Sequence, residues 1–576
     1  MVVSIVSLCL AAAAAAQDPP AVQLLEHQAL TAELHRLSDA YGHVELVSLG
    51  RSRDGHMLEG LRFGTKAEAA PAILLVANLD GPRVFTSGVA LHHCRRLAEA
   101  YATDERVSAL LDSTVVYVIP RANPDAAELR FAEPRFEHRA GGTGVDNDRD
   151  GREGEDGPAD VNGDGVIATM RYADPDGAWI EDPTDPRALV KADPFKGERG
   201  RFKLVVEGRD SDGDERVAED PAFDAVLNRN FASGWEQHED YAGLFPTDAP
   251  EVRALADFMI GRRDLALVLT YDELDNLVEA PKTVKDDARA VKRVPAAGVR
   301  ESDGNVLKEL GKRYRDVTGA KAKKKGGDEG TFQRFSYDHR GLLTLEALLW
   351  DLPQQDPPKP EQPEDAEQGS EAGEEAAAEE EAPKRESKKD KPKPSEDAKR
   401  LAWIDAQGDA EAWRFVPWTP FEHPELGPVE IGGFAPFARL DPPAGEWDAI
   451  ADKHLDFLLG LGELLPRVEL VECTMEPVGE GLWRVEAAVE NAALLPLQSR
   501  SARRTRTVRP AKVELVLPEA ATLVAGRHMQ QLSELDGSGG RFEASWLVLG
   551  PEDMEVGVSV DTDNAGTDRR KAEVIR

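Results

Sequence analysis

The chain has 576 residues, enough for roughly two to four domains of ordinary size. It carries 70 Lys and Arg against 107 Asp and Glu, and the resulting formal net charge of −37 repels nucleic-acid backbones and anionic lipid. We therefore expect neither a nucleic-acid partner nor membrane insertion. The three cysteines, Cys9, Cys94 and Cys473, are too few for a disulfide framework or a cysteine-rich zinc site. Any catalytic metal would have to be held by His, Asp or Glu.

Residues 2–16 form an apolar, alanine-rich run that ends in Ala-x-Ala before Gln17. Such a run is typical of a signal peptide with its cleavage site, and it is too short to span a bilayer comfortably. No Lys or Arg precedes it, which leaves a frayed start or a misassigned initiator as the alternative. We expect residues 1–16 to be a signal peptide and the protein to be secreted or periplasmic.

Composition divides the rest of the chain into four parts. Residues 22–353 alternate short apolar runs with helical patterns, whereas residues 354–400 consist mainly of Pro, Glu, Lys and Ala and should be disordered. Residues 401–466 return to a globular composition and end in a helical run. Residues 467–576 contain short, evenly spaced strand-like runs with turn signals between them, which predicts a C-terminal β-sandwich.

The first part has the pattern of an α/β domain with a mixed, mostly parallel sheet flanked by helices. Continuous apolar runs predict buried strands over residues 72–77, 114–120 and 265–270. Helical spacing predicts helices over residues 87–101 and 250–263, the second capped by Asp248. Ligands of such sheets bind beyond the carboxyl ends of the strands, so the turns at residues 78–83 and 271–276 are the candidate site.

Five ordered blocks between residues 49 and 351 resemble those of the zinc carboxypeptidases of the carboxypeptidase A type. The first block is Leu49-Gly50-Arg51-Ser52 with Gly55, and the second is Asn123-Pro124-Asp125. The third is Leu227-Asn228-Arg229-Asn230-Phe231 with Trp235, and the fourth runs from Gly243 to Glu251. The fifth is Tyr337-Asp338-His339-Arg340-Gly341 with Trp350-Asp351. The resemblance covers residues 22–353, with an Asp-rich insert at 141–220, and resumes over residues 401–466. It implies the family's α/β fold and, for an active member, removal of C-terminal residues from peptides.

The resemblance also implies a zinc site, and this chain departs from it at every position. Family members hold zinc by His and Glu in an H-x-x-E turn and by a second His, and a Glu on a later strand is the general base. The first pair of positions is occupied here by Asp80 and Arg83, the second His position by Asp272, and the base position by Leu348.

These replacements predict that the family's chemistry is lost. The guanidinium of Arg83 is never deprotonated and would place a cation where the metal belongs, and Leu348 cannot accept a proton. Glu346 shares strand parity with Leu348 but is displaced by roughly 7 Å along the strand, so we do not expect it to substitute. We expect no zinc and no catalytic residue, with the carboxylates and Arg83 forming an ion cluster. His92 and His93 point about 100° apart on a helix and would not share a metal, so we expect solvated or half-buried helix histidines.

The anion-binding side of the family site is retained in the sequence. Asn228 and Arg229 stand where the family holds the substrate's C-terminal carboxylate, and a bidentate contact between Arg and a carboxylate needs no metal. The alternative is that Arg229 pairs with the carboxylates left at the former metal positions. A second family arginine follows the Asn-Pro-Asp turn, and Arg135 and Arg139 are both candidates for it.

Two acidic loops of the insert repeat the first half of a calcium-binding loop, with alternate oxygen-bearing side chains followed by Gly. Neither has Glu at the twelfth position, so they are not EF-hands. Calcium-stiffened loops and merely solvated acidic loops remain equal alternatives. The candidate ligands are Asp146, Asp148, Asp150, Asp160, Asn162 and Asp164.

Five arginines between residues 500 and 509 form a basic strip, for which we expect an exposed hairpin or, as a sharper alternative, a docking site for the acidic linker. The leading functional hypothesis is a secreted, catalytically inactive carboxypeptidase-like protein that binds the C-termini of peptides or proteins. One alternative is an active zinc metallocarboxypeptidase that acts in proteolysis. The other is an interaction scaffold that acts through the β-sandwich.

Overall fold

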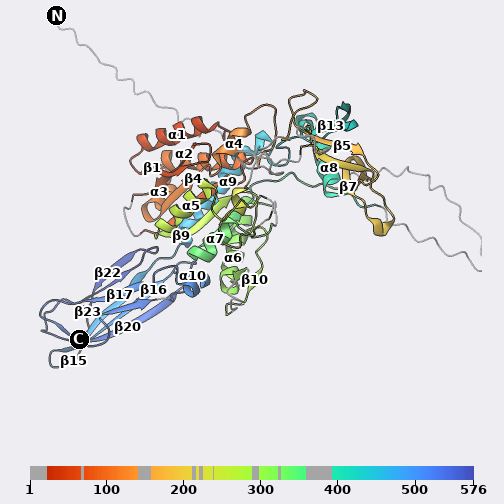
Figure 1. Cartoon of the computed structure of the whole chain (residues 1–576). Helices are drawn as coiled ribbons and strands as arrows, with labels where there is room; N and C mark the ends of the chain where they lie inside the picture. Colours follow the sequence, from red (N-terminus) through yellow and green to blue (C-terminus); the bar gives the residue numbers. More distant parts are fainter. Residues whose placement is uncertain are drawn as a thin grey trace, which may run out of the picture.

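The computed structural model has three parts (Figure 1): a central α/β domain with an insert sheet on one side and a C-terminal β-domain on the other. It describes residues 22–65, 70–139, 157–210, 216–218, 225–237, 239, 241–287, 298–321, 326–357, 392–532 and 534–575. The predicted signal peptide, the first acidic loop and most of the linker lie outside these ranges. Within them, every helix is too short or too polar to cross a bilayer.

The central sheet has six strands in the order β1-β2-β4-β3-β9-β12. Strands β4, β3, β9 and β12 are parallel, and β1 and β2 extend one edge in antiparallel pairing, so the predicted mixed sheet is confirmed. The strands are β1 (Val44–Arg51), β2 (Met57–Phe63), β3 (Ala72–Ala77), β4 (Val115–Ile119), β9 (Leu265–Tyr271) and β12 (Leu343–Ala347). Strands β3 and β4 are buried on both faces, which explains their uninterrupted apolar sequences.

Helices cover both faces of this sheet. Ile73 and Leu75 of β3 pack into one core with α1, α2, α6 and α9, whereas Leu74 and Val76 pack into a second core with α5 and α7. The helices of the domain are α1 (His27–Ala40), α2 (Val84–Glu99), α3 (Glu105–Ser113), α4 (Pro124–Leu129), α5 (Pro250–Gly261), α6 (Glu301–Thr318), α7 (Phe332–Arg340) and α9 (Trp447–Leu461). The predicted cap of α5 is wrong, because the N-cap is Ala249 and Asp248 instead accepts a hydrogen bond from the amide of Leu244.

The insert sheet combines two segments that are far apart in the sequence. Its order is β13-β14-β5-β8-β6-β7, and Met170 of β5 pairs with Ile431 of β14. Its elements are β5 (Thr169–Ala173), β6 (Trp179–Asp182), β7 (Asp185–Lys191), β8 (Phe202–Val206), β13 (Phe415–His423) and β14 (Gly427–Phe434), with α8 (Glu396–Gln407) against β7. The segment after the linker therefore supplies strands to this sheet and α9 to the central domain.

The C-terminal β-domain is a sandwich of a five-stranded sheet, β18-β20-β16-β15-β23, and a four-stranded sheet, β19-β17-β21-β22, around one apolar core. Its strands are β15 (Glu469–Gly479), β16 (Leu482–Asn491), β17 (Ala511–Val516), β18 (Thr522–Ala525), β19 (Met529–Leu532), β20 (Gly540–Leu549), β21 (Gly557–Asp561), β22 (Thr567–Lys571) and β23 (Glu573–Val574). The expectation of an exposed hairpin for the basic strip is wrong, because the strip begins with the short helix α10 (Arg500–Thr505).

Candidate functional site

The turns after β3 and β9 meet at the carboxyl end of the sheet. The two strands are parallel neighbours, with Ala77 opposite Tyr271, so the residues that follow them lie side by side. The backbone amide of Asp80 donates to Oδ1 of Asp272 at 2.8 Å, and both carboxylates are buried. Two of the three positions that the resemblance aligns with zinc ligands are thus in direct contact.

The third position, Arg83, precedes the first turn of α2 and is also buried. Its Nε donates to Oδ2 of Asp80 at 3.1 Å, and its Nη1 donates to the carbonyl oxygen of Trp350 at 3.3 Å. The guanidinium therefore bridges the turn after β3 to the segment after β12. The predicted pairing of this cation with the carboxylates is realised through Asp80.

Asp272 is held from a second side by the loop that carries Asn228. The side-chain amide of Asn228 donates to Oδ2 of Asp272 at 3.4 Å, and its carbonyl oxygen accepts from the amide of Phe332 at 2.9 Å. Burial, followed by the negative charges of Asp80 and Glu273, raises the pKa of Asp272 well above its usual range. Both polar atoms of the Asn228 side chain are therefore occupied, one by Asp272 of the cluster and the other by Phe332 at the start of α7.

Of the two candidate arginines, Arg135 is exposed, whereas Arg139 faces the cluster. Nη2 of Arg139 donates to Glu273 at 2.7 Å, and its Nε lies 3.6 Å from Oδ1 of Asp80. The charge of Asp80 raises the pKa of Arg139 above its usual range. Two guanidinium groups, Arg83 from the buried side and Arg139 from the open side, thus neutralise Asp80.

This donor set does not fit a catalytic zinc. Catalytic zinc sites combine three protein ligands, each a neutral nitrogen, a thiolate or a carboxylate, with one open position. Here the permanent cation of Arg83 lies with its Nε 3.1 Å from Oδ2 of Asp80. Both oxygens of Asp272 already accept hydrogen bonds from Asp80 and Asn228. Leu348, at the position of the general base, is a buried aliphatic side chain.

The paired histidines of α2 lie elsewhere. Nε2 of His92 is 3.0 Å from Oδ1 of Asp452, and Nε2 of His93 is 3.1 Å from the carbonyl oxygen of Ala451. Both rings are buried against α9, so the expectation of solvated or half-buried rings is wrong, and their role is to join α2 to α9.

A cavity of about 650 Å³ opens beside the cluster, and its charged lining consists of Arg139 and Arg229 together with Glu236, Glu239, Glu273 and Glu329. Within the described part of the chain, Arg229 has Glu329 as its ion-pair partner, with Nη1 4.0 Å from Oε2, and not Asp80 or Asp272. The side chains of Arg139 and Arg229 are 42% and 41% exposed. We call this cavity the arginine pocket. Glu273 and Glu329 were not singled out from the sequence, although Glu273 directly follows Asp272.

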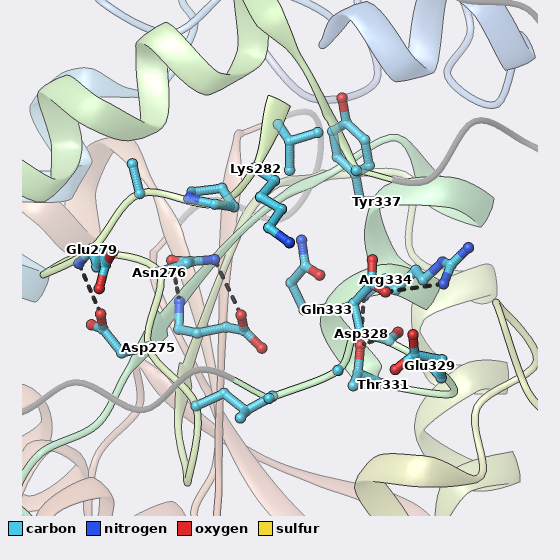
Figure 2. A pocket seen from close by; sticks show the side chains of 18 of the residues that line it. Asp275, Asn276, Glu279, Lys282, Asp328, Glu329, Thr331, Gln333, Arg334 and Tyr337 are labelled. Carbon is cyan, nitrogen blue, oxygen red and sulfur yellow. Dashed lines mark hydrogen bonds and ion pairs between the residues drawn. The ribbon is translucent and has the colours of Figure 1, made fainter. Parts of the chain in front are cut away.

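A second cavity, of about 450 Å³, lies between the loop after β9 and α7 (Figure 2) and shares Leu274, Gly326 and Glu329 with the arginine pocket. We call it the acidic cavity, because its lining includes Asp275, Glu279, Asp328, Glu329, Asp338 and Glu346. Oε2 of Glu346 accepts from the side-chain amide of Asn276 at 3.3 Å. Burial, followed by the charges of Asp275 and Asp328, raises the pKa of Glu346 to about 8.

Of the candidate calcium ligands, those of the second loop lie in the described part of the chain. The carboxylate of Asp160 accepts hydrogen bonds from the amides of Gly163, Asp164 and Gly165, at 2.7 to 3.2 Å. Asn162 donates to Asp164 at 3.1 Å. The side-chain oxygens of this loop therefore accept hydrogen bonds from donors of the same loop, which closes a tight turn. The ligands predicted in the first loop, Asp146, Asp148 and Asp150, lie outside the described residues.

Comparisons with known proteins agree with the fold and with the motifs. A family model described as Zinc carboxypeptidase matches residues 30–413, and one described as a domain of unknown function matches residues 467–573. The chain is 29% identical over 96 residues to a zinc carboxypeptidase of Saccharothrix mutabilis subsp. capreolus, and this alignment covers 16% of this chain and 22% of that protein. It is 32% identical over 84 residues to carboxypeptidase A2 of Rattus norvegicus, covering 15% and 20%.

These alignments span about a fifth of the length of the curated relatives. Among solved structures, carboxypeptidase A from Helicoverpa armigera is 14% identical and has a TM-score of 0.34, with 57% of this chain and 65% of that chain covered. The family model alone covers more than half of the chain and includes the turns that carry Asp80, Arg83, Asn228 and Asp272. The chain therefore belongs to the zinc carboxypeptidase family.

Proposed function

We propose that this protein is a non-catalytic carboxypeptidase-like receptor that binds the free C-terminus of a peptide or protein in the arginine pocket. The observation that carries the proposal is that Arg139 and Arg229, from separate segments, line one open cavity beside a buried ion cluster. A carboxylate is the natural ligand of two guanidinium groups, because each can donate two parallel hydrogen bonds to it.

Arg229 is the better anchor of the two. Its ion-pair distance of 4.0 Å from Glu329 is beyond hydrogen-bond length, so among the described residues this pairing leaves its guanidinium open to a ligand carboxylate. Arg139 is held more tightly, at 2.7 Å from Glu273, and contributes charge from a fixed position. In this arrangement Arg229 moves onto the ligand while Arg139 orients it.

Loss of hydrolysis is the second half of the proposal. Family hydrolysis needs a Lewis acid to polarise the scissile carbonyl and a base to activate water. The positions for these groups hold the ion pair of Asp80 and Arg83, the hydrogen-bonded Asp272 and a buried Leu348. A bound peptide is therefore not cleaved and dissociates intact.

The direct test is equilibrium binding of fluorescent peptides that differ only in a free or an amidated C-terminus. We expect the free form to bind tighter and Arg229→Ala to weaken it by about 10- to 100-fold, the cost of losing a charged hydrogen-bonded partner. Arg229→Lys should give an intermediate loss, because a lysine lacks the bidentate fork. Arg484→Ala is the matched control, since Arg484 is 45% exposed, paired with Glu476 and located in the β-domain. Equal binding of the free and amidated peptides would refute the proposal.

Two other functions give different outcomes. Membership of the family favours an active zinc metallocarboxypeptidase, and this alternative predicts stoichiometric zinc and release of C-terminal residues from the same peptides. A scaffold acting through the β-domain predicts partner binding that is unaffected by Arg229→Ala and by C-terminal amidation.

Export and calcium binding complete the proposal. A mature chain that begins at Gln17 in N-terminal sequencing would support secretion or a periplasmic location. Calcium in the acidic loops should raise the thermal midpoint of unfolding, and Asp160→Asn should abolish the shift, because Asp160 supplies a carboxylate to the second loop. An unchanged midpoint in millimolar calcium would leave these loops as merely solvated turns.

A further inference from the structure

The helix α10 of the C-terminal β-domain is docked against α6 and α7 of the central domain. Oγ of Ser499 donates to the carbonyl oxygen of Gly341 at 2.6 Å, and Oγ of Ser501 donates to that of Tyr337 at 3.1 Å. Ala502 packs so closely on Gly341 that a Cβ at residue 341 would collide with it. Gly341 also has φ +65°, so glycine is required there for two reasons.

A buried carboxylate, Asp303, joins the two domains. Its Oδ1 accepts from the amide of Arg500 at 2.8 Å, and its Oδ2 accepts from the amide of Ser501 at 3.2 Å. The hydroxyl of Tyr337 donates to the same Oδ2 at 2.6 Å and accepts from the amide of Arg300. Burial raises the pKa of Asp303, and the donors from α10 and Tyr337 oppose that shift by stabilising the charged form.

The other side of α7 forms a wall of the acidic cavity. Gln333, Arg334 and Tyr337 all line it, at the three- and four-residue spacing that places side chains on one helix face. Figure 2 shows these three side chains together across the cavity from Asn276 and Glu279. Tyr337 is thus in contact with the cavity and, through its hydroxyl, with the carboxylate that receives α10.

We propose that the β-domain positions this wall: α10, acting through Asp303, holds Tyr337 and α7 in the orientation that shapes the acidic cavity. The inference rests on the proposed function in one respect, namely that the side chain of the peptide's terminal residue enters this cavity while its carboxylate lies in the arginine pocket. Tyr337 is a positioning residue, and the β-domain is part of the binding unit and not an independent appendage. Undocking α10 would remove two of the three hydrogen-bond donors described above for Asp303, and its buried charge would lose that stabilisation.

The first perturbation comes from the β-domain alone, so that it alters no residue of the cavity. Ala502→Leu inserts a larger side chain at the contact with Gly341 and should wedge α10 away. Ala520→Leu is the matched control, because it makes the same substitution at an exposed position of the same domain. Tyr337→Phe is the second variant, since it keeps the ring in the wall and removes only the hydroxyl that reaches Asp303.

The first readout, native-state hydrogen exchange of the amides in α7, does not depend on any ligand. Ala502→Leu should raise their exchange by about tenfold or more, and Ala520→Leu should leave it unchanged. The second readout is binding of free-acid peptides that end in Arg or in Gly. Ala502→Leu and Tyr337→Phe should each reduce the preference for Arg while keeping the preference for a free over an amidated terminus. The double variant should lose no more than the stronger single variant, because both break one linkage.

The outcomes separate the two proposals. If wild-type protein does not distinguish free from amidated peptides, the proposed function fails, yet faster exchange in α7 would still support the positioning by α10. If exchange in α7 and the preference for Arg are both unchanged in Ala502→Leu and Tyr337→Phe, the positioning role is overturned. If Ala502→Leu does not fold, Tyr337→Phe decides the matter by the same two measurements.

Discussion

The buried pair of Arg83 and Asp80 gives the sharpest prediction of stability. Both side chains are almost inaccessible, at 4% and 1% exposure, and their Nε and Oδ2 atoms are 3.1 Å apart. Arg83→Met would leave Asp80 with the more distant Arg139, at 3.6 Å, beside the carboxylate of Asp272. Removing one partner of a buried ion pair costs about 3–5 kcal/mol when the remaining charge is left uncompensated, and because Arg139 still faces Asp80 we expect the lower end of that range.

The assay is native-state hydrogen exchange in β3 and β9, which measures the free energy of opening these strands. Arg83→Met should lower that free energy by about 3 kcal/mol or more, and adding Asp80→Asn should recover most of the loss because it removes the stranded charge. Arg36→Met is the control, since Arg36 pairs with Glu33 but is 49% exposed, and it should cost less than about 1 kcal/mol. Equal losses in Arg83→Met and Arg36→Met would refute the ion-cluster interpretation.

Three further predictions concern the acidic cavity and the former metal positions. The folded-state pKa of Glu346, about 8, exceeds its ordinary value of 4.5, so the folded state binds more protons between these values and stability falls as pH rises through them. Glu346→Gln should therefore match wild type in denaturant titrations at pH 4 and exceed it by up to about 5 kcal/mol at pH 9, whereas an identical pH profile would contradict the burial of this carboxyl. Free-acid peptides that end in Arg or Lys should bind tighter than those that end in Leu, and the difference should grow as pH rises through about 8 because deprotonated Glu346 attracts a cation. Calorimetry in buffers of different ionisation enthalpy should detect the release of a proton on binding. Tighter binding of the peptides that end in Leu would contradict this role of Glu346. The quadruple variant Asp80→His, Arg83→Glu, Asp272→His and Leu348→Glu should bind zinc in equilibrium dialysis, and a folded variant that binds none would show the register to be wrong.

The carboxyl end of the sheet could be predicted from local sequence. Continuous apolar runs predict β3 and β9 as buried parallel strands, and the residues after such strands lie at the same edge of the sheet. The contact between Asp80 and Asp272 depends in addition on the adjacency of β3 and β9, which only the structure shows. The predicted departure from the family's zinc ligands rests on residue identity at positions aligned by motif, which needs no coordinates.

The partners of the arginines could not be predicted, because they depend on where long loops return. Arg229 reaches Glu329, which is 100 residues away, and Arg139 is oriented by a loop whose Glu137 accepts a hydrogen bond from Phe437. The basic strip misled for a different reason. Its arginines are conspicuous in the sequence, but the docking is done by the small residues Ser501 and Ala502, whose role is defined only by the close approach to the central domain.

The central claim is that these positions hold an ion cluster in place of a hydrolytic metal, and metal analysis of the purified wild-type protein after equilibration with zinc tests it most directly. The account predicts no stoichiometric zinc and no release of C-terminal residues, while free-acid peptides still bind through Arg229. One tightly bound zinc per chain, removed by a chelator together with exopeptidase activity, would contradict it.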